Sequence, residues 1–177
     1  PHAKSFTPEG EEYDYEELWK YESRLREVMV ENKDPNTSNT HKYTLDWQNK
    51  MTRYYLNKAI LHHDYNLEYF ELPEDEGLVP TVPSRREYIY WIYDLFNEFE
   101  SKGEPEKSLK GLDIGVGASV IYPLIGIKEY NWKFTGSDIW EESIKIAQQI
   151  VDKNNLGDSI TLKHQPKSKH IFEGILD

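Results

Sequence analysis

The feature that most constrains this chain is a glycine turn between a predicted strand and a predicted helix. Residues 109–114 are predicted to form a short buried strand, and the chain then reads Gly115-Val116-Gly117-Ala118-Ser119. Glycine allows positive φ angles and lets the backbone approach a ligand closely. The backbone N–H groups that begin the following helix favour polar or anionic ligand atoms. The turn is therefore a candidate binding site, although two glycines also suffice for a tight strand–helix connection without a ligand.

An acidic residue follows the glycine turn at the distance expected of a group that binds the ribose of a nucleoside ligand. Asp138 follows Gly115 by 23 residues (138 − 115) and comes at the predicted end of the next strand. A carboxylate there can accept hydrogen bonds from both hydroxyls of a ribose, as in folds that bind dinucleotides or S-adenosylmethionine. A dinucleotide fingerprint would have glycine at position 120, where this chain has Val120. The pattern therefore favours S-adenosylmethionine, and a nicotinamide-dependent Rossmann enzyme is the weaker alternative.

Predicted strands alternate with predicted helices in the second half of the chain. The strands are expected at residues 109–114, 132–137 and 160–164, with helices at 120–127, interrupted near Pro123, and at 141–154. This alternation is typical of βαβ units and predicts an α/β fold with a parallel sheet.

The first half of the chain has helical periodicity. Helices are expected at residues 14–31 and 46–63, after a polar lead-in at 1–13. Ser84 and Glu87 have the spacing of a capping box, so a third helix is predicted to begin at Ser84 and to end before a charged linker at 98–107. Its predicted buried face consists of Tyr88, Trp91, Ile92, Leu95 and Phe96.

Composition excludes several classes of protein. The chain has 177 residues and no cysteine, which excludes a disulfide scaffold and a thiolate zinc site. Its longest uncharged stretch, residues 114–127, is shorter than the roughly 20 residues that span a bilayer, so no membrane association is expected. The net charge of −11 argues against sequence-independent nucleic-acid binding over the whole surface.

Two smaller clusters have plain interpretations. His62, His63 and Asp64 are adjacent, so on a helix they do not face one site, and no metal is predicted there. A basic cluster in the predicted last segment could contact RNA phosphates or could be a solvated polar loop; it comprises Lys163, Lys167, Lys169 and His170.

Two blocks of sequence resemble a known family. Residues 80–91 read Pro-Thr-Val-Pro-Ser-Arg-Arg-Glu-Tyr-Ile-Tyr-Trp, and residues 111–124 read Gly-Leu-Asp-Ile-Gly-Val-Gly-Ala-Ser-Val-Ile-Tyr-Pro-Leu. They resemble the P-T-V-P-x-R-x-x-Y-I-x-W and G-I-D-I-G-T-G-A-S-C-I-Y-P-L motifs of the adenine-N6 RNA methyltransferases. That family modifies U6 small nuclear RNA in eukaryotes (the methyltransferase-like 16 type) and 23S ribosomal RNA in bacteria. The resemblance covers about residues 44–170.

The resemblance implies a class I, Rossmann-like methyltransferase fold that uses S-adenosylmethionine as cofactor. By motif position, Arg85 would bind the methionine carboxylate of the cofactor, and Asp138, where many relatives have Glu, would hold its ribose. The turn residues that would line the cofactor are Gly115, Gly117, Ala118 and Ser119. The loop after the third strand lies near the cofactor in the family, so residues 165–169 are expected to contribute a contact.

The family's acceptor motif, Asn-Pro-Pro-Phe, follows the fourth strand and is absent, because the chain stops at Asp177. We therefore expect an N-terminal part of the enzyme with a partial sheet, completed by the rest of its own chain or by a partner. The predicted organisation is an N-terminal polar and helical extension at 1–43, a helical preface at 44–107 and the first half of the methyltransferase domain at 108–177.

The predicted function is S-adenosylmethionine-dependent N6-adenine methylation of structured RNA, inside the cell in the nucleus or the cytoplasm. The alternative is a catalytically incomplete, methyltransferase-like module that binds cofactor or RNA.

Overall fold

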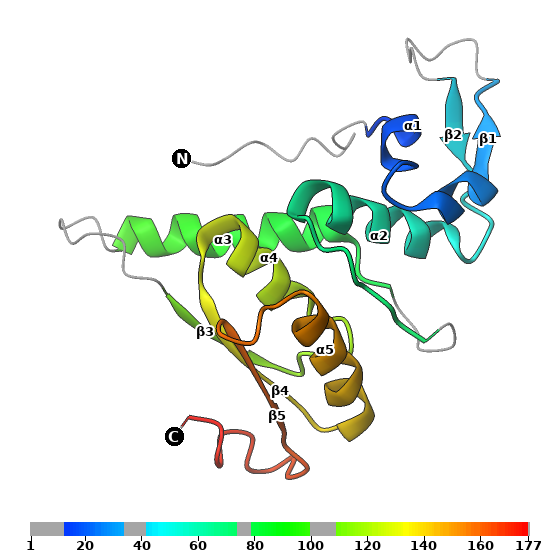
Figure 1. Cartoon of the computed structure of the whole chain (residues 1–177). Helices are drawn as coiled ribbons and strands as arrows, with labels where there is room; N and C mark the ends of the chain where they lie inside the picture. The colour runs from blue at the N-terminus through cyan, green and yellow to red at the C-terminus, as the bar shows by residue number, and fades with distance from the viewer. Residues whose placement is uncertain (1–12, 34–41, 74–78, 100–108, 177) are drawn as a thin grey trace. The chain divides into compact units, whose positions relative to one another are not determined.

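The computed structural model describes residues 13–33, 42–73, 79–99 and 109–176. The chain divides into two compact units between Glu68 and Tyr69 (Figure 1). The predicted lead-in, apart from residue 13, and most of the predicted linker lie outside the described residues. The domain boundaries proposed from the sequence stay predictions.

The N-terminal unit combines short helices with a two-stranded antiparallel sheet. Its elements are α1 (Tyr15–Leu18), the 3-10 helix η1 (Ser23–Val28), β1 (Met29–Glu31), β2 (Tyr43–Leu45) and α2 (Thr52–Tyr65). The prediction of one helix over 14–31 is wrong. Asp14 caps α1 by accepting the N–H groups of Glu16 and Glu17, and Glu22 begins a separate helix by accepting the N–H of Arg24.

The second predicted helix exists but begins six residues later than expected, at Thr52 rather than at Asp46 (52 − 46). The Asp46 carboxylate accepts the N–H of Gln48, and the Asn49 side chain accepts the N–H of Met51. Such local side-chain bonds compete with helical ones and hold the backbone in turns. The helix therefore begins only where these turns end.

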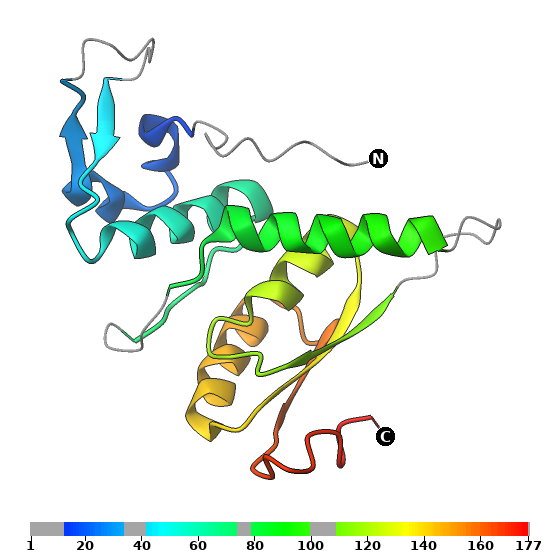
Figure 2. The same ribbon diagram turned by 180° about the vertical axis from the view of Figure 1, so that it is seen from behind.

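The C-terminal unit contains a parallel sheet of three strands in the order β3-β4-β5. The strands are β3 (Lys110–Ile114), β4 (Lys133–Asp138) and β5 (Ile160–His164), so all three predicted strands are confirmed within one residue at each end. The prediction that the first of them is buried is wrong, because Leu112 and Ile114 of β3 are 36% and 44% exposed. Figures 1 and 2 show α4 (Ile121–Tyr130) and α5 (Glu141–Lys153) on one side of this sheet. Within the described residues β3 is an edge strand, as expected of a partial sheet.

Close packing between α4 and the sheet depends on residues without side chains. The Phe134 ring of β4 lies against Gly111 of β3 and Gly126 of α4, and a Cβ atom at either glycine would collide with it.

Pro123 does not interrupt α4, contrary to the prediction, because it is the third residue of the helix. The N–H groups of the first turn have no intrahelical partner, so proline costs no hydrogen bond there.

The helix α3 (Val82–Phe99) packs on α4 through aromatic rings. The Tyr93 ring stacks on Tyr130 with centroids 4.0 Å apart, and Tyr130 stacks in turn on Trp132 at 5.1 Å. The Tyr90 hydroxyl donates to Glu129 at 2.9 Å. These contacts fix α3 beside the start of β4.

Two predictions about α3 are wrong. It begins at Val82 rather than at Ser84, whose hydroxyl donates to the Thr81 carbonyl instead of capping the helix. The expected buried face is largely exposed: Phe96, Tyr88, Leu95 and Trp91 are 40% to 69% exposed. The helix carries apolar residues on two sides, and the side with Ile89, Tyr90 and Tyr93 is the one that packs closely on α4 and the residues after it.

Candidate functional site

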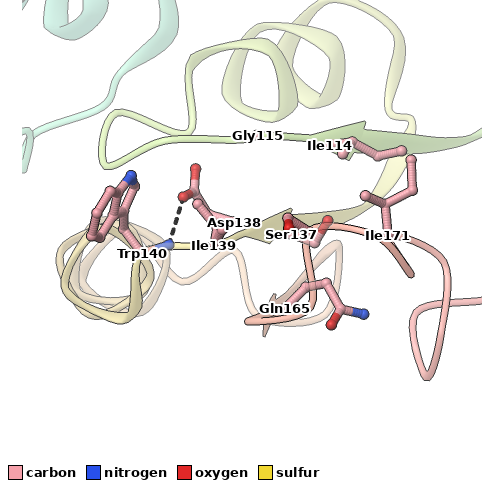
Figure 3. Close-up of a pocket in the computed structure, with 9 residues that line it drawn as sticks. Ile114, Gly115, Ser137, Asp138, Ile139, Trp140, Gln165 and Ile171 are labelled. Atoms are coloured by element: carbon pink, nitrogen blue, oxygen red, sulfur yellow. Dashed lines mark hydrogen bonds between the residues drawn. The ribbon is translucent and has the colours of Figure 1, made fainter.

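A pocket of about 380 Å³ lies at the carboxyl ends of the three parallel strands (Figure 3). In open α/β sheets ligands bind at this end of the strands. The volume is within the range of about 300–1,000 Å³ that is usual for small-molecule sites. The lining residues are Ile114 and Gly115 after β3, Ser137, Asp138, Ile139 and Trp140 around the end of β4, and Gln165, Ser168 and Ile171 after β5.

Asp138 connects the two loops that border the pocket. Its Oδ2 accepts the N–H of Gly117 at 2.9 Å, and its Oδ1 accepts the N–H of Trp140 at 2.9 Å. A carboxylate has about four acceptor positions, so two remain for hydroxyl groups of a ligand. The structure therefore brings Asp138 and Gly117 together, as the spacing in the sequence required.

The glycine turn adopts the backbone conformation for which glycine is needed. Gly115 has φ +78° and Gly117 has φ +65°, and a Cβ atom at either position would project into open space. The N–H groups of Gly115 and Val116 both donate to the Ser137 carbonyl, at 2.7 and 2.9 Å, which fixes the turn against the end of β4. The open space above the glycines and the free acceptor positions of Asp138 fit the ribose and amino-acid parts of S-adenosylmethionine.

Asp113, on β3, is a second carboxyl group near Asp138. Its Oδ2 atom is buried and has no hydrogen-bond partner among the described residues. Burial and, to a smaller extent, the charge of Asp138 raise the pKa of Asp113 from 3.8 to about 6. An unpaired buried oxygen and a raised pKa are typical of functional sites, where such costs are tolerated.

Gly117 and the remaining predicted cofactor residues lie outside the pocket lining. Ala118 and Ser119 continue the turn to Val120, which begins α4 with φ +48°, a conformation that is rare for a β-branched residue. Arg85 is half-buried in the first turn of α3, where its Nη1 donates to the Ser84 hydroxyl at 3.1 Å. The structure thus places Gly115 and Asp138 in the lining and bonds Gly117 to Asp138, whereas Arg85 is not among the lining residues.

Arg85 nevertheless lies on the side of α3 that faces the start of α4. Tyr88 follows it by three residues, and side chains with this spacing share a helix face. The Tyr88 ring packs on Tyr122 of α4 with centroids 5.2 Å apart.

Several lining residues were missed by the sequence analysis. Ile139 and Trp140 directly follow Asp138, and that adjacency could have identified them. Ile171 comes from a segment whose structure was left unassigned, and no sequence pattern pointed to it. The expected contact from residues 165–169 corresponds to Gln165 and Ser168 in the lining.

Within the described residues, no three His, Asp or Glu side chains are grouped in a way that could hold a metal ion. None of the described helices is both long enough and apolar enough to span a membrane.

Comparison with known proteins gives consistent matches along the chain. The model of a family described as RNA methyltransferase matches residues 7–177. Ribosomal RNA large subunit methyltransferase F of Aeromonas salmonicida is 37% identical over 164 residues, which are 93% of this chain and 50% of the relative. The corresponding protein of Pseudoalteromonas translucida is 42% identical over 123 residues, 69% of this chain and 39% of the relative.

Solved structures with the same arrangement include parts of human METTL16. Its N-terminal domain in complex with SAH aligns with a TM-score of 0.77 and 27% identity, covering 94% of this chain and 60% of that one. Its catalytic domain in complex with the MAT2A 3′UTR hairpin 1 aligns with a TM-score of 0.72 and 27% identity, covering 89% and 49%.

The chain spans about half the length of the bacterial relatives that it matches. Its three parallel strands, with α4 and α5 on one side, match the corresponding part of the METTL16 methyltransferase domain, so the predicted class I methyltransferase fold is confirmed. The family model, the bacterial relatives and this fold agree with one another, and the chain belongs to the RNA methyltransferase family.

Proposed function

We propose that this chain carries the cofactor-binding half of an enzyme that transfers a methyl group from S-adenosylmethionine to the N6 amine of an adenine in structured RNA. The observation that carries the proposal is the Asp138 carboxylate at the pocket, bonded to the N–H of Gly117 and with acceptor positions left for ribose hydroxyls. The names of the relatives support an RNA substrate: they are ribosomal RNA methyltransferases and a human enzyme crystallised with RNA hairpins.

Each site residue has a distinct task in this proposal. Asp138 accepts hydrogen bonds from the ribose hydroxyls, and the Gly115–Gly117 backbone leaves space for the amino-acid part of the cofactor. Arg85 offers a guanidinium that can bind a carboxylate through two parallel hydrogen bonds. Ala118 and Ser119 present the N–H groups that precede α4, which favour polar or anionic ligand atoms.

When bound, S-adenosylmethionine supplies an activated methyl group on its sulfonium, so the reaction requires no metal. The protein contributes orientation and removal of water, which are large effects when the reacting atoms are held in line. The groups that hold the adenine come from the second half of the enzyme, as the family resemblance implies. An enzyme with an RNA substrate works inside the cell, in the nucleus or the cytoplasm according to the RNA that it modifies.

Two open surfaces support completion of the domain by a further segment, from the rest of its own chain or from a partner. The outer edge of β3 has no strand beside it within the described residues, and unpaired edges are a hazard for aggregation. The apolar stripe of α3 that includes Tyr88, Trp91 and Leu95 is exposed in the same unit. A strand beside β3 and side chains over this stripe would cover both surfaces.

The test is to incubate the complete protein with S-adenosylmethionine and an RNA hairpin and to digest the RNA for mass spectrometry. The expected product is N6-methyladenosine, lost in the Asp138→Ala variant. Methylation of another position would refute the assignment of the acceptor. Cofactor binding without any methylated RNA would instead support the alternative, a methyltransferase-like module that binds cofactor or RNA without catalysis.

A further inference from the structure

One acidic side chain of α4, Glu129, contacts two successive turns of α3. Its Oε1 atom accepts the Tyr90 hydroxyl at 2.9 Å and lies 3.9 Å from Nε of Arg86. Arg86 and Tyr90 are four residues apart, so they share one face of the helix. The side chains of Glu129 and Arg86 are 23% and 13% exposed, so the ion pair is largely shielded from water. Glu129 is therefore a fixed point between two helices that lie against each other (Figures 1 and 2).

Aromatic rings supply further contacts between α3 and α4. Tyr93 stacks on Tyr130 with an interplanar angle of 2°, and Tyr88 packs on Tyr122 with the two rings tilted. Ring pairs are favourable over a range of offsets and distances. A hydrogen bond, by contrast, weakens steeply when its angle changes. The rings therefore hold the helices together, and the Glu129 contacts set how far along α4 the helix α3 lies.

The position of α3 matters because it carries Arg85, which directly precedes Arg86. Arg85 is not among the residues that line the pocket, so the placement of α3 decides whether its guanidinium reaches a ligand there. Its Nη1 donates to the Ser84 hydroxyl, but this bond is exposed to solvent. An exposed bond offsets little of the rotamer entropy of a long side chain. The backbone of α3 is therefore what fixes Arg85.

Recognition of a carboxylate by arginine depends on accurate placement. Two parallel N–H···O bonds form only when the planar guanidinium and the carboxylate are aligned. In enzymes, a misplacement of about 1 Å in a binding group can cost about 100-fold in rate. A movement of the first turn of α3 along α4 would carry Arg85 with it. The contacts that set α3 on α4 thereby affect the affinity for a carboxylate.

We propose that Glu129 is a positioning residue for cofactor binding, which holds Arg86 and Tyr90 and thereby places Arg85 for the carboxylate of S-adenosylmethionine. The inference rests on the proposed function, in which Arg85 binds that carboxylate. Glu129 acts through α3. It lies at the C-terminal end of α4, whereas the glycine turn precedes the N-terminal end.

The experiment measures dissociation constants by isothermal titration calorimetry with the complete protein and two ligands. S-adenosylhomocysteine carries the carboxylate, and S-adenosyl-3-thiopropylamine is the same molecule without it. Glu129→Ala removes both contacts to α3. Tyr90→Phe keeps the ring and the charge of Glu129 and removes only the hydroxyl. Arg85→Ala and the double variant Arg85→Ala/Glu129→Ala complete a double-mutant cycle, which measures whether the two residues act together.

Glu129→Ala is expected to weaken S-adenosylhomocysteine binding about tenfold and Tyr90→Phe about threefold, which is at or below the effect of losing one charged hydrogen bond. The affinity for S-adenosyl-3-thiopropylamine is expected to stay unchanged in both variants. With Arg85→Ala already present, Glu129→Ala should cause no further loss.

The matched controls lie away from the contact between α3 and α4. Glu68→Ala removes an exposed carboxylate, and Tyr69→Phe removes a hydroxyl that lies 3.5 Å from the Gln149 side-chain oxygen. Both controls are expected to leave the two affinities unchanged.

The sign of the effect separates positioning from a general electrostatic contribution. Removing the charge of Glu129 makes the potential around Arg85 more positive, which by itself would strengthen the binding of a carboxylate. Tighter binding of S-adenosylhomocysteine by Glu129→Ala would therefore overturn the inference. An equal loss for both ligands would also overturn it, and so would losses that add in the double variant. If Glu129→Ala does not fold, Tyr90→Phe decides the question by the same ligand pattern.

Failure of the proposed function has a different signature. A wild-type protein that binds neither ligand would refute the proposed cofactor. Unchanged S-adenosylhomocysteine affinity in Arg85→Ala would refute the proposed task of Arg85, and the role of Glu129 with it. If Arg85→Ala weakens S-adenosylhomocysteine binding and Glu129→Ala and Tyr90→Phe do not, only the role of Glu129 is refuted.

Discussion

Asp113→Asn should stabilise the C-terminal unit at neutral pH. The pKa of Asp113 is raised from 3.8 to about 6 by burial and by the charge of Asp138, so the folded state binds the proton more tightly than the unfolded state. For an acid with a raised pKa, the free energy of unfolding falls as pH rises from about 4 to about 6 and stays low above that range. The difference between the two pKa values corresponds to at most about 3 kcal/mol. Asparagine has the same shape and no charge, so the variant should regain up to this amount at pH 7.

The measurement is urea unfolding of wild type and variant between pH 4.5 and pH 8, followed by hydrogen exchange of peptides from residues 109–138. These peptides report on the C-terminal unit separately from the N-terminal one. The control is Asp158→Asn in the exposed turn before β5, which removes the same charge without a buried site. The variant curve should lie above that of wild type at pH 7, and the gap should narrow to about a third of its pH 7 value as pH falls to 4.5. Parallel curves with no convergence would refute the reasoning, because the ionisation of Asp113 would then not affect stability.

Three further predictions follow from single contacts. Asp138→Ala should weaken S-adenosylhomocysteine binding by about 1–3 kcal/mol in calorimetry, because ribose hydroxyls lose their acceptor; an unchanged dissociation constant would count against the ribose assignment. Gly117→Ala should cost about 1–2 kcal/mol of backbone strain at φ +65° and weaken the same ligand, which a titration of the folded variant would reveal. Glu22→Gln should destabilise the N-terminal unit by about 1–3 kcal/mol in urea unfolding at pH 7, since Glu22 is buried and forms ion pairs with Arg24 and Lys58. Burial opposes ionisation of Glu22, but the hydrogen bonds from Arg24 and the charge of Lys58 outweigh burial and lower the pKa of Glu22. The stability advantage of wild type over Glu22→Gln should therefore disappear as pH falls below about 4.5. A difference in stability that does not change with pH would contradict this reasoning.

The C-terminal unit was well predicted because its strands and helices alternate along the chain, and the glycine turn and Asp138 mark the ends of two strands. Residues 160–164 were assigned as a strand at the bounds that the structure gives, and the glycine turn was placed correctly before α4. The N-terminal unit was not, because two acidic side chains, Asp14 and Glu22, end and restart the helical backbone within a pattern of helical periodicity. The exposed stripe of α3 could not be distinguished from its packed side, since both sides of the helix are apolar.

The sequence predicted those site residues that short motifs and their spacing can identify. Gly115, Gly117 and Asp138 were found from spacing, and the structure brings them together. Ile171 was not found, because its place in the lining depends on the Gln165 and Lys163 bonds that fold the loop after β5. The unpaired oxygen of Asp113 was also missed, because burial of one carboxylate atom depends on the packing of neighbouring elements.

The most direct test is a calorimetric titration of the full chain with S-adenosylhomocysteine and, separately, with NAD. The expected result is binding of one S-adenosylhomocysteine per chain, weaker binding by Asp138→Ala, and no binding of NAD. Binding of NAD in preference to S-adenosylhomocysteine, or no binding of S-adenosylhomocysteine, would contradict the proposed cofactor site at Gly115, Gly117 and Asp138.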